Sequence, residues 1–350
     1  MDTERRSRDR VPELDLLRFV AAASVVLFHL MREGVGAVTA RYGFMGVELF
    51  FIISGFVILW TASEKSGPQF VATRLARLYP SFWLCVVVTT GALIWADRAP
   101  TPATFLANLT MVPKWLGHPP VDAVYWTLVV EIYFYAIIFV LQVTRQLQRL
   151  EWFLLAWLIL CTLQWPDVLQ LRGNAPLFIS GCVLFLMRSR GPSVRRSIIL
   201  GWSAGLAINQ VAHHHVDFTH FAGTQPVVIV CAVMLVIYAA MTAIAMRWLR
   251  LPSHPAWYIL GTMTYPLYLL HNVPGLILLK YLPDWVPGKL AVTLVIVVTA
   301  AAAVAWLTER RVCPWVQKRL LALLERVSDR STGTAPLRCA GMKQQNAEEH

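Results

Sequence analysis

The stretch LDLLRFVAAASVVLFHLM, residues 14–31, is the most informative segment of the 350-residue chain. It predicts one hydrophobic helix with Arg18 near its start and His29 near its end, eleven residues later. Each residue turns an α-helix by about 100° and advances it by about 1.5 Å, so the two side chains share one face and lie roughly 16 Å apart along the axis. Ionisable groups inside a bilayer are costly, which makes both residues functional candidates.

Small and apolar side chains occupy the same face of this helix between its two polar ends. Ala22 and Val25 complete the stripe, which is therefore narrow in its middle. A structural alternative exists for each polar residue, because Arg18 could extend its guanidinium to the interface and His29 could cap the helix end. The occurrence of both on one face favours a functional interpretation.

The composition excludes a soluble domain. The chain is 57% hydrophobic and only 15% charged, and its mean hydropathy is +0.55. A soluble domain of this size needs more polar surface. The 14 Trp and 10 Tyr fit the aromatic belts of a bilayer protein. The composition therefore predicts a polytopic membrane protein.

Ten hydrophobic runs are candidates for spanning helices, which need about 20 apolar residues each. They are residues 14–31, 43–62, 79–96, 124–143, 152–165, 175–188, 197–212, 226–246, 256–280 and 289–308. With the N-terminus in the cytoplasm, 23 of the 31 Lys and Arg fall on the cytoplasmic side, 7 fall on the opposite side and Arg18 lies within a helix. This bias predicts an all-α polytopic membrane protein of about ten transmembrane helices, with N- and C-termini cytoplasmic.

The same pattern divides the chain into three parts. Residues 1–12 form a cytoplasmic N-terminal tail, followed by a retained first helix rather than a cleaved signal peptide. Residues 13–309 form the transmembrane domain. Residues 310–350 begin with RRVCPWVQKRLLALLERV, a basic amphipathic helix expected at the cytoplasmic interface, and end in a tail expected to be disordered from Ser328. The net charge of +11 follows this membrane topology, so nucleic acid is not an expected partner.

Two arginines precede the third run in the segment RLARLYP, residues 74–80. Arg74 and Arg77 are three residues apart, so a helix places them on one face at the cytoplasmic side. Guanidinium groups make bidentate contacts with phosphate oxygens, which predicts a phosphate-bearing ligand. Anchoring to lipid headgroups is the structural alternative.

Two carboxylates lie within hydrophobic runs. Glu48, in GVELFFIISGF, is near the outer end of its helix, and the following Ser54-Gly55 step favours close helix packing. Glu131, in YWTLVVEIYFY, lies one or two turns deeper than its interfacial aromatic residues. An unpaired carboxylate at that depth would be costly, so we expect His29 or an arginine as its partner.

Two histidine motifs lead to different expectations. The segment TYPLYLLH places Tyr268 and His271 in a hydrophobic helix, where a structural hydrogen bond is the alternative to a site role. The cluster His213-His214-His215, with Asp217 and His220, is expected in a polar outer loop. Its spacing matches no helical ligand pair, so no metal site is predicted.

Several of these stretches together resemble the acyltransferase-3 family of membrane-bound O-acyltransferases, which is common in bacteria. The resemblance is carried in order by LDLLRFVAAASVVLFHL, which is similar to an Arg-x10-His motif, and by GVELFFIISGF, RLARLYP, YWTLVVEIYFY, YPLYLLH and WLTERRVCP. It extends from about residue 13 to 314. Two departures are conservative, since Glu48 stands where Asp is common and Thr127 stands where Ser is commoner.

The resemblance implies transfer of an acyl group, chiefly acetyl, from cytoplasmic acyl-CoA to a hydroxyl group. The acceptors it implies are glycans, lipid-linked sugars or secondary metabolites, at a bacterial inner membrane. The donor is a substrate, and no permanently bound cofactor is expected. The roles are as follows: His29 and Glu131 catalytic, Arg18, Arg74 and Arg77 donor-binding, and Glu48, Tyr268 and His271 candidate substrate-binding residues.

The chemistry suggests a division of labour. The CoA phosphates would bind near the arginines, and the pantetheine arm would run along the stripe towards His29. An acceptor hydroxyl is a poor nucleophile, so His29 would take its proton, oriented by Glu131, or would itself carry the acyl group. The rival interpretation is a proton-coupled transporter, because ten helices with intramembrane ionisable residues also fit that class.

Overall fold

The computed structural model describes residues 11–31, 37–163, 171–219, 224–283 and 285–332, and the regular secondary structure in these residues is helical. The first half of the chain forms α2 (Pro12–Leu30), α3 (Ala37–Ala40), η1 (Arg41–Met45), α4 (Gly46–Glu64), α5 (Gly67–Trp95), α6 (Pro102–Asn108), η2 (Pro113–Leu116), η3 (Ala123–Tyr125), α7 (Trp126–Val143), η4 (Gln146–Arg149) and α8 (Leu150–Thr162). The second half forms α9 (Leu171–Arg190), α10 (Val194–Thr219), α11 (Thr224–Ala245), α12 (Pro255–Leu270), α13 (Val273–Tyr281), α14 (Lys289–Leu307), η5 (Thr308–Val312) and α15 (Cys313–Thr332).

Five helical segments in the described residues are long and apolar enough to cross a membrane. They are Arg41–Glu64, Gly67–Trp95, Ala123–Val143, Pro226–Ala245 and Lys289–Glu325. Each overlaps one of the ten predicted runs. The first run forms α2, which carries three charged residues, and the fifth forms α8, which has only 13 residues. An all-helical membrane protein is therefore confirmed, while the count of ten spans and the side of the termini stay predictions.

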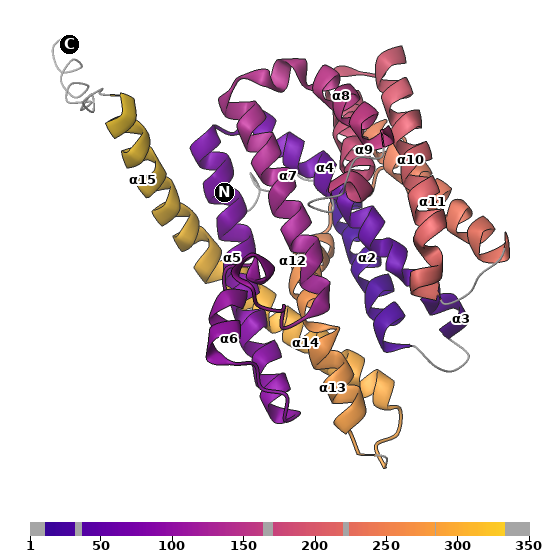
Figure 1. Cartoon of the computed structure of the whole chain (residues 1–350), viewed down its shortest axis with the longest axis vertical. Coiled ribbons are helices and arrows are strands. Elements are labelled where there is room, and N and C mark those ends of the chain that lie inside the picture. Colours follow the sequence, from indigo (N-terminus) through magenta and orange to yellow (C-terminus); the bar gives the residue numbers. More distant parts are fainter. Residues whose placement is uncertain (1–10, 32–36, 164–170, 220–223, 284, 333–350) are drawn as a thin grey trace, which may run out of the picture.

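The long helices run side by side, with α9 to α11 on one side of the bundle and α5, α6 and α15 on the other (Figure 1). Two clusters of buried apolar side chains hold them together. One cluster surrounds α4 and α7 to α11, and the other surrounds α5, α12 and α14. Helix α2 joins the two, because Ala21 belongs to the first cluster and Ala22 to the second.

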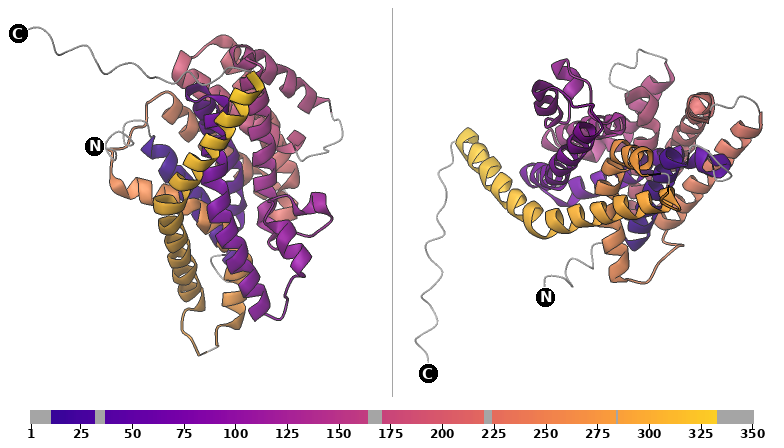
Figure 2. Two further views of the ribbon diagram at one scale, coloured as in Figure 1. Left: turned by 90° about the vertical axis from the view of Figure 1, so that its left-hand side faces the viewer. Right: turned by 90° about the horizontal axis from the view of Figure 1, so that it is seen from below.

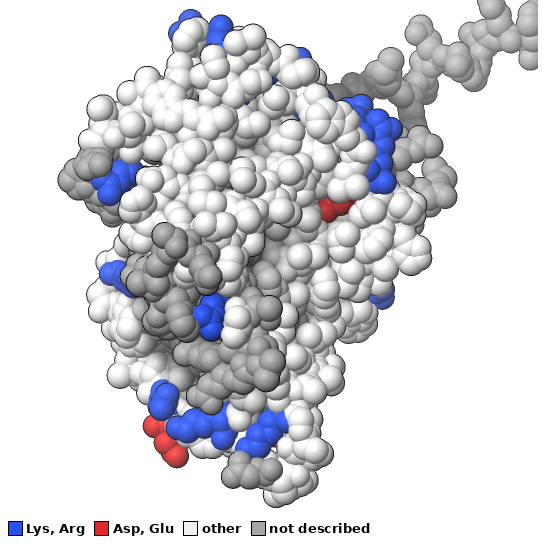
Figure 3. Space-filling model, turned by 90° about the vertical axis from the view of Figure 1, so that its right-hand side faces the viewer, with Lys and Arg blue, Asp and Glu red and all other residues white. Residues whose placement is uncertain are grey.

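The outer surface is largely apolar. Figure 3 shows a face that is uncharged over most of its area. Large hydrophobic side chains are exposed on many helices, for example Val87 at 53%, Val236 at 68% and Val295 at 65%. Such a surface is stable against lipid tails and unfavourable in water, which agrees with the predicted environment.

Helix α5 begins earlier than the sequence suggests. The run 79–96 was expected to start at the Tyr79-Pro80 pair, but the helix begins at Gly67 and continues through Pro80. A capping box between Ser66 and Gln69 fixes its start. The helix tolerates the missing hydrogen bond at Pro80 within a packed membrane bundle. As a result, Arg74 and Arg77 lie within the same helix as the third run rather than before it.

The ninth predicted run, 256–280, is broken. Helix α12 ends at Leu270 and α13 begins at Val273, with His271 and Asn272 between them. Pro274 at the start of α13 lacks the N–H that would continue a helix. By contrast, the tenth run continues, because α14 passes through the π-helical turn η5 into α15.

Two segments that were predicted to be irregular are helical in the structure. His213, His214 and the backbone of His215 belong to α10, which extends to Thr219, rather than to an outer loop. In α10, the apolar residues Val216 and Phe218 alternate with the polar residues that suggested a loop. The segment from Ser328 to Thr332, which was predicted to be disordered, belongs to α15, and the rest of the predicted tail lies outside the described residues.

Close packing at the Ser54-Gly55 step is confirmed for the glycine. A Cβ atom on Gly55 would overlap the carbonyl oxygen of Phe178 on α9, and one on Gly181 would overlap that of Ile52 on α4. The two backbones therefore touch where α4 crosses α9. Ser54 has a different partner, which belongs to the site described below.

The contact at Gly55 predicts a stability effect. The variant Gly55→Ala is expected to lose about 1–3 kcal/mol, because a backbone carbonyl cannot move aside. Thermal unfolding in detergent, followed by tryptophan fluorescence, should show a Tm lower by several degrees. In the matched control Gly201→Ala, no atom lies within 4 Å of the new Cβ, and alanine favours the helix. Equal Tm values for Gly55→Ala and the wild type would contradict this packing.

Candidate functional site

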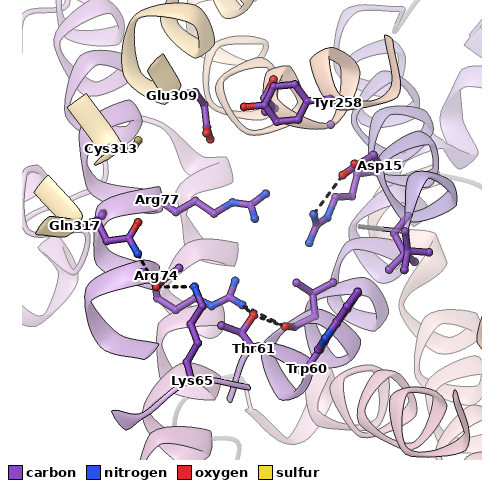
Figure 4. Close-up of a pocket in the computed structure, with 18 of the residues that line it drawn as sticks. Asp15, Trp60, Thr61, Lys65, Arg74, Arg77, Tyr258, Glu309, Cys313 and Gln317 are labelled. Atoms are coloured by element: carbon purple, nitrogen blue, oxygen red, sulfur yellow. Dashed lines mark hydrogen bonds and ion pairs between the residues drawn. The ribbon is translucent and has the colours of Figure 1, made fainter. Parts of the chain in front are cut away.

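Three predicted arginines converge on one pocket. It has a volume of about 490 Å³ and lies among α2, α4, α5, α12 and the η5–α15 junction (Figure 4). Its charged lining consists of Arg18, Lys65, Arg74, Arg77, Asp15, Glu64 and Glu309. Arg18 comes from α2 and the other two arginines come from α5, so two separate motifs of the sequence form one cationic surface.

Arg18 is held at the pocket by a carboxylate on its own helix. Its Nη1 lies 3.9 Å from Oδ1 of Asp15, and both side chains are only 16% exposed. Helix α12 approaches this pair closely, because a Cβ on Gly261 would lie 2.5 Å from Oδ1 of Asp15. The guanidinium is thus partly neutralised while its side chain faces the cavity.

Arg74 is tied to the protein more firmly than its partners. It is 5% exposed, and its Nη2 donates hydrogen bonds to the hydroxyl of Thr61 and, at 3.1 Å, to the carbonyl of Val57. Its Cζ lies 5.8 Å from the ring centroid of Phe70 and 5.6 Å from that of Tyr135. Nε is buried without a hydrogen-bond partner among the described residues. Arg74 therefore links α4, α5 and α7 as well as lining the pocket.

Arg77 extends into the middle of the pocket, with the carboxylate of Glu309 above it in Figure 4. Glu309 lies in η5, and this turn is fixed to α5 by a buried hydrogen bond of 2.9 Å between the hydroxyls of Thr308 and Ser81. π-Helical turns are rare and often occur at functional sites.

Lys65 is a fourth cation that the sequence analysis did not select. It lies between α4 and α5, and its Nζ donates to the hydroxyl of Thr73 at 3.0 Å. Burial, followed by the nearby Arg74, lowers the pKa of the Lys65 ammonium. The signal available in the sequence was its place in the two-residue connection directly before the arginine-bearing helix.

Glu131 lies deeper than the pocket. Its Oε1 accepts hydrogen bonds from Ser54 at 3.0 Å and from Tyr135 at 2.8 Å. Ser54 and Thr61 are seven residues apart on one face of α4, so the carboxylate lies roughly 10 Å from the level of Thr61. The hydrogen-bond donors are thus two hydroxyls and not the predicted imidazole or guanidinium. All three arginines remain within electrostatic range.

The two predicted histidines meet at the other end of α2. The ring centroids of His29 and His271 are 5.1 Å apart. His271 is fully buried, and its Nδ1 lies 2.6 Å from the carbonyl oxygen of Tyr268. A carbonyl only accepts, so Nδ1 carries the proton and Nε2 of the neutral ring is an acceptor. That Nε2 is buried without a hydrogen-bond partner in the described residues.

The break between α12 and α13 is fixed by Asp122. Its carboxylate is 1% exposed and accepts hydrogen bonds from Asn272 Nδ2 at 2.7 Å, from the Val273 amide at 2.9 Å and from the Val124 amide at 3.1 Å. Burial raises the pKa of the Asp122 carboxyl, and these hydrogen bonds oppose the rise. His271 is adjacent to Asn272, so this loop carboxylate controls where the imidazole lies.

Tyr268 and Glu48 lie near the same end of the bundle. The hydroxyl of Tyr268 is 3.0 Å from that of Thr127 and 3.2 Å from the carbonyl of Val124. Glu48 is in the first turn of α4, and Oε2 of its carboxylate is buried without a hydrogen-bond partner among the described residues. Phe50 of the same helix contacts Tyr268, with 5.7 Å between ring centroids. The three candidate substrate-binding residues therefore belong to the histidine end.

The His213–His215 cluster has no site geometry in the part that can be described. His213 is exposed, and its Nδ1 lies 2.7 Å from the carbonyl of Asn209. The side chains of His215 and Asp217, and the whole of His220, lie outside the described residues. Within the described residues, no three His, Cys, Asp or Glu side chains are grouped as metal ligands.

Comparisons with known proteins agree with the geometry. A family model described as an acyltransferase domain matches residues 11–310. BcsY of Komagataeibacter xylinus, named as a membrane-bound transacylase, is 27% identical over 79% of this chain and 75% of its own length. The peptidoglycan O-acetyltransferase OatA of Listeria monocytogenes is 38% identical over 25% of this chain and 14% of OatA. ExoZ of Rhizobium meliloti, named for exopolysaccharide production, is 36% identical over 27% of this chain and 33% of ExoZ.

No solved structure matches the chain. The family match nevertheless covers most of the sequence, including every candidate site residue from Arg18 to His271. The chain therefore belongs to the acyltransferase-3 family of membrane-bound O-acyltransferases, the family that its motifs resemble.

Proposed function

We propose that this protein moves an acyl group, chiefly acetyl, from acyl-CoA to a hydroxyl of a glycan, a lipid-linked sugar or a secondary metabolite. The observation that carries the proposal is the arrangement along α2. A cationic pocket with Arg18 lies at one end, and the His29–His271 pair lies at the other. The two ends are separated by roughly 16 Å, a distance that a pantetheine arm spans.

The pocket suits the nucleotide part of the donor. CoA carries a pyrophosphate and a ribose phosphate, and guanidinium groups bind phosphate through two parallel hydrogen bonds. Arg18 and Arg77 face the cavity, and Arg74 closes it on one side. The carboxylates of Asp15 and Glu309 offset part of the positive charge of the pocket, and the donor phosphates would replace them as partners of the arginines.

The histidine end suits the transfer step. In the proposed reaction, His29 takes the proton of the acceptor hydroxyl as its oxygen attacks the thioester carbonyl. The carbon–sulfur bond then breaks, and the CoA thiolate leaves with that proton as free thiol. His271, with its unprotonated Nε2 close to His29, accepts a hydrogen bond from the imidazole or from the acceptor hydroxyl. The carboxyl group of Glu131 lies between the two ends, where it would support either the arginines or the imidazolium.

The membrane arrangement completes the proposal. The protein would span the inner membrane of a bacterium about ten times with both termini in the cytoplasm, residues 1–12 and 310–350 forming the flanking cytoplasmic parts of the 13–309 transmembrane domain. The names of OatA and ExoZ refer to peptidoglycan and to an exopolysaccharide. They support a glycan as the first acceptor to test.

The decisive experiment measures free CoA thiol. Purified protein in lipid vesicles is mixed with acetyl-CoA, with and without a candidate glycan, and thiol release is followed with a chromogenic disulfide. An acyltransferase should release thiol only when acceptor is present, in equal amount with the ester formed. A proton-coupled transporter would instead accumulate solute and leave acetyl-CoA intact, which would overturn the proposal.

A further inference from the structure

Helix α15 has one face towards the bundle and one away from it. On the inner face, Gln317 Nε2 donates to the Thr73 hydroxyl at 3.2 Å, and this hydroxyl also accepts from Lys65. Cys313 and Pro314 of the same helix line the arginine pocket. The position of α15 on α5 therefore decides whether one wall of the pocket is complete.

The outer face combines indole rings with cations. Trp306 at the end of α14 is 52% exposed, and Trp315 is 60% exposed. Arg310 and Arg311 lie over the ring of Trp306, with Cζ 6.0 and 5.7 Å from its centroid, and Arg319 lies over Trp315 at 5.7 Å. With the exposed Lys318, these residues form what we call the Trp–Arg face: Trp306, Arg310, Arg311, Trp315, Lys318 and Arg319.

The charges of the Trp–Arg face lack partners in the described part of the protein. None of its four cations lies in an ion pair among the described residues. A cation–π contact with an indole uses none of the five N–H donors of a guanidinium, so these donors remain available to an oxygen ligand. The helix also reaches sideways beyond the bundle when seen from below (Figure 2), and all six residues of the Trp–Arg face are exposed.

Chemistry and position together select the ligand. Tryptophan favours the boundary between lipid tails and water, and lysine and arginine beside it attract anionic headgroups. Leu323, one turn beyond Arg319, is 57% exposed, which would be unfavourable against a soluble anion and favourable against lipid tails. We propose that the Trp–Arg face binds the phosphates of anionic phospholipids, and that this binding holds α15 against α5 and closes the pocket wall at Cys313 and Gln317.

Cys313 offers a readout that needs no acyl donor. The full-length protein is placed in nanodiscs of phosphatidylcholine, or of phosphatidylcholine with part replaced by phosphatidylglycerol. Alkylation of Cys313 by an uncharged maleimide is then followed by peptide mass spectrometry. The rate should fall by about fivefold or more in the anionic discs, because several headgroup contacts add to the docking of α15. The result does not depend on whether acyl-CoA is the donor.

Two triple variants distinguish an effect of the Trp–Arg face from an effect of the protein's net charge. In R310Q/R311Q/R319Q, Cys313 should react at the same rate in both discs. In R149Q/R190Q/R250Q, which removes three exposed arginines elsewhere, the difference between discs should persist. This comparison also removes the general effect of an anionic surface on local pH. Both triple variants should match the wild type in detergent Tm.

Three results would overturn the inference. One is an equal Cys313 rate for the wild type in the two discs. Another is loss of the lipid effect in both triple variants, which would assign it to net charge. The third is protection of wild-type Cys313 by soluble glycerophosphate in phosphatidylcholine discs that is lost in R310Q/R311Q/R319Q, which would identify the Trp–Arg face as a site for free phosphate instead of a lipid surface.

Discussion

Membranes that carry His29→Ala are expected to transfer acyl groups from acyl-CoA about 10²- to 10⁴-fold more slowly than wild-type membranes, the usual loss when a general base is removed. The KM for the donor should change little, because Arg18 lies roughly 16 Å away along α2. Initial rates at several acetyl-CoA concentrations separate kcat from KM. His213→Ala, which removes an exposed histidine at the end of α10, is the matched control. Wild-type activity in well-expressed His29→Ala would remove this residue from the mechanism.

Glu131→Gln distinguishes two roles for the deeper carboxylate. The amide oxygen of glutamine still accepts hydrogen bonds from Ser54 and Tyr135, so the variant should fold. If the Glu131 carboxylate stabilises the imidazolium of His29, the Glu131→Gln variant should have a lower kcat. If the carboxylate instead offsets the positive charge of the arginines, the variant should have a changed KM for the donor.

Arg77→Gln is expected to raise the KM for acetyl-CoA by about 10- to 100-fold, because a charge-assisted hydrogen bond to phosphate contributes about 1.5–3 kcal/mol. The value of kcat at saturating donor should stay within a few-fold of the wild type. Arg149→Gln, which removes an exposed cation outside the pocket, should leave both values unchanged. If KM were unchanged in Arg77→Gln, the arginine would serve the protein or the lipid rather than the donor.

Substitution of Arg74 tests donor binding less clearly than substitution of Arg77. Its side chain donates to Thr61 and to the carbonyl of Val57 on α4, and it packs over two aromatic rings. Arg74→Ala would therefore lower the Tm as well as donor affinity. The sequence motif does not distinguish Arg74 from Arg77. The packing shows that the guanidinium of Arg74 is bound to the protein and that the guanidinium of Arg77 faces the pocket.

The positions of the arginines could be predicted because helix geometry is local. Spacing alone puts Arg18 and His29 on one face of α2, and puts Arg74 and Arg77 on one face of α5. That Arg18 shares a pocket with Arg74 and Arg77 depends on how α2 packs in the bundle relative to α5, which no local pattern encodes. The family resemblance supplied that link before the structure did.

The misjudged features depend on side chains far apart in sequence. Glu131 was expected beside an imidazole or an arginine, whereas its donors are a serine of α4 and a tyrosine one turn away. The break at Asn272 could not be read from an apolar run, because its stabilising carboxylate, Asp122, is 150 residues earlier. Pro80 gave a misleading boundary, since a packed bundle tolerates a proline that would end an isolated helix.

The π-helical turn η5 sets the rotational phase of the last helix. Such a turn accommodates one residue more than an α-helix would, and each residue corresponds to about 100° of rotation. A chain shorter by one residue between Thr308 and Val312 would turn all of α15 by about that angle. Gln317 would then lose its hydrogen bond to Thr73. The indole of Trp315 would point in a different direction from the bundle. A single position in the backbone thus decides which chemistry the C-terminal helix presents to the pocket and which to the membrane.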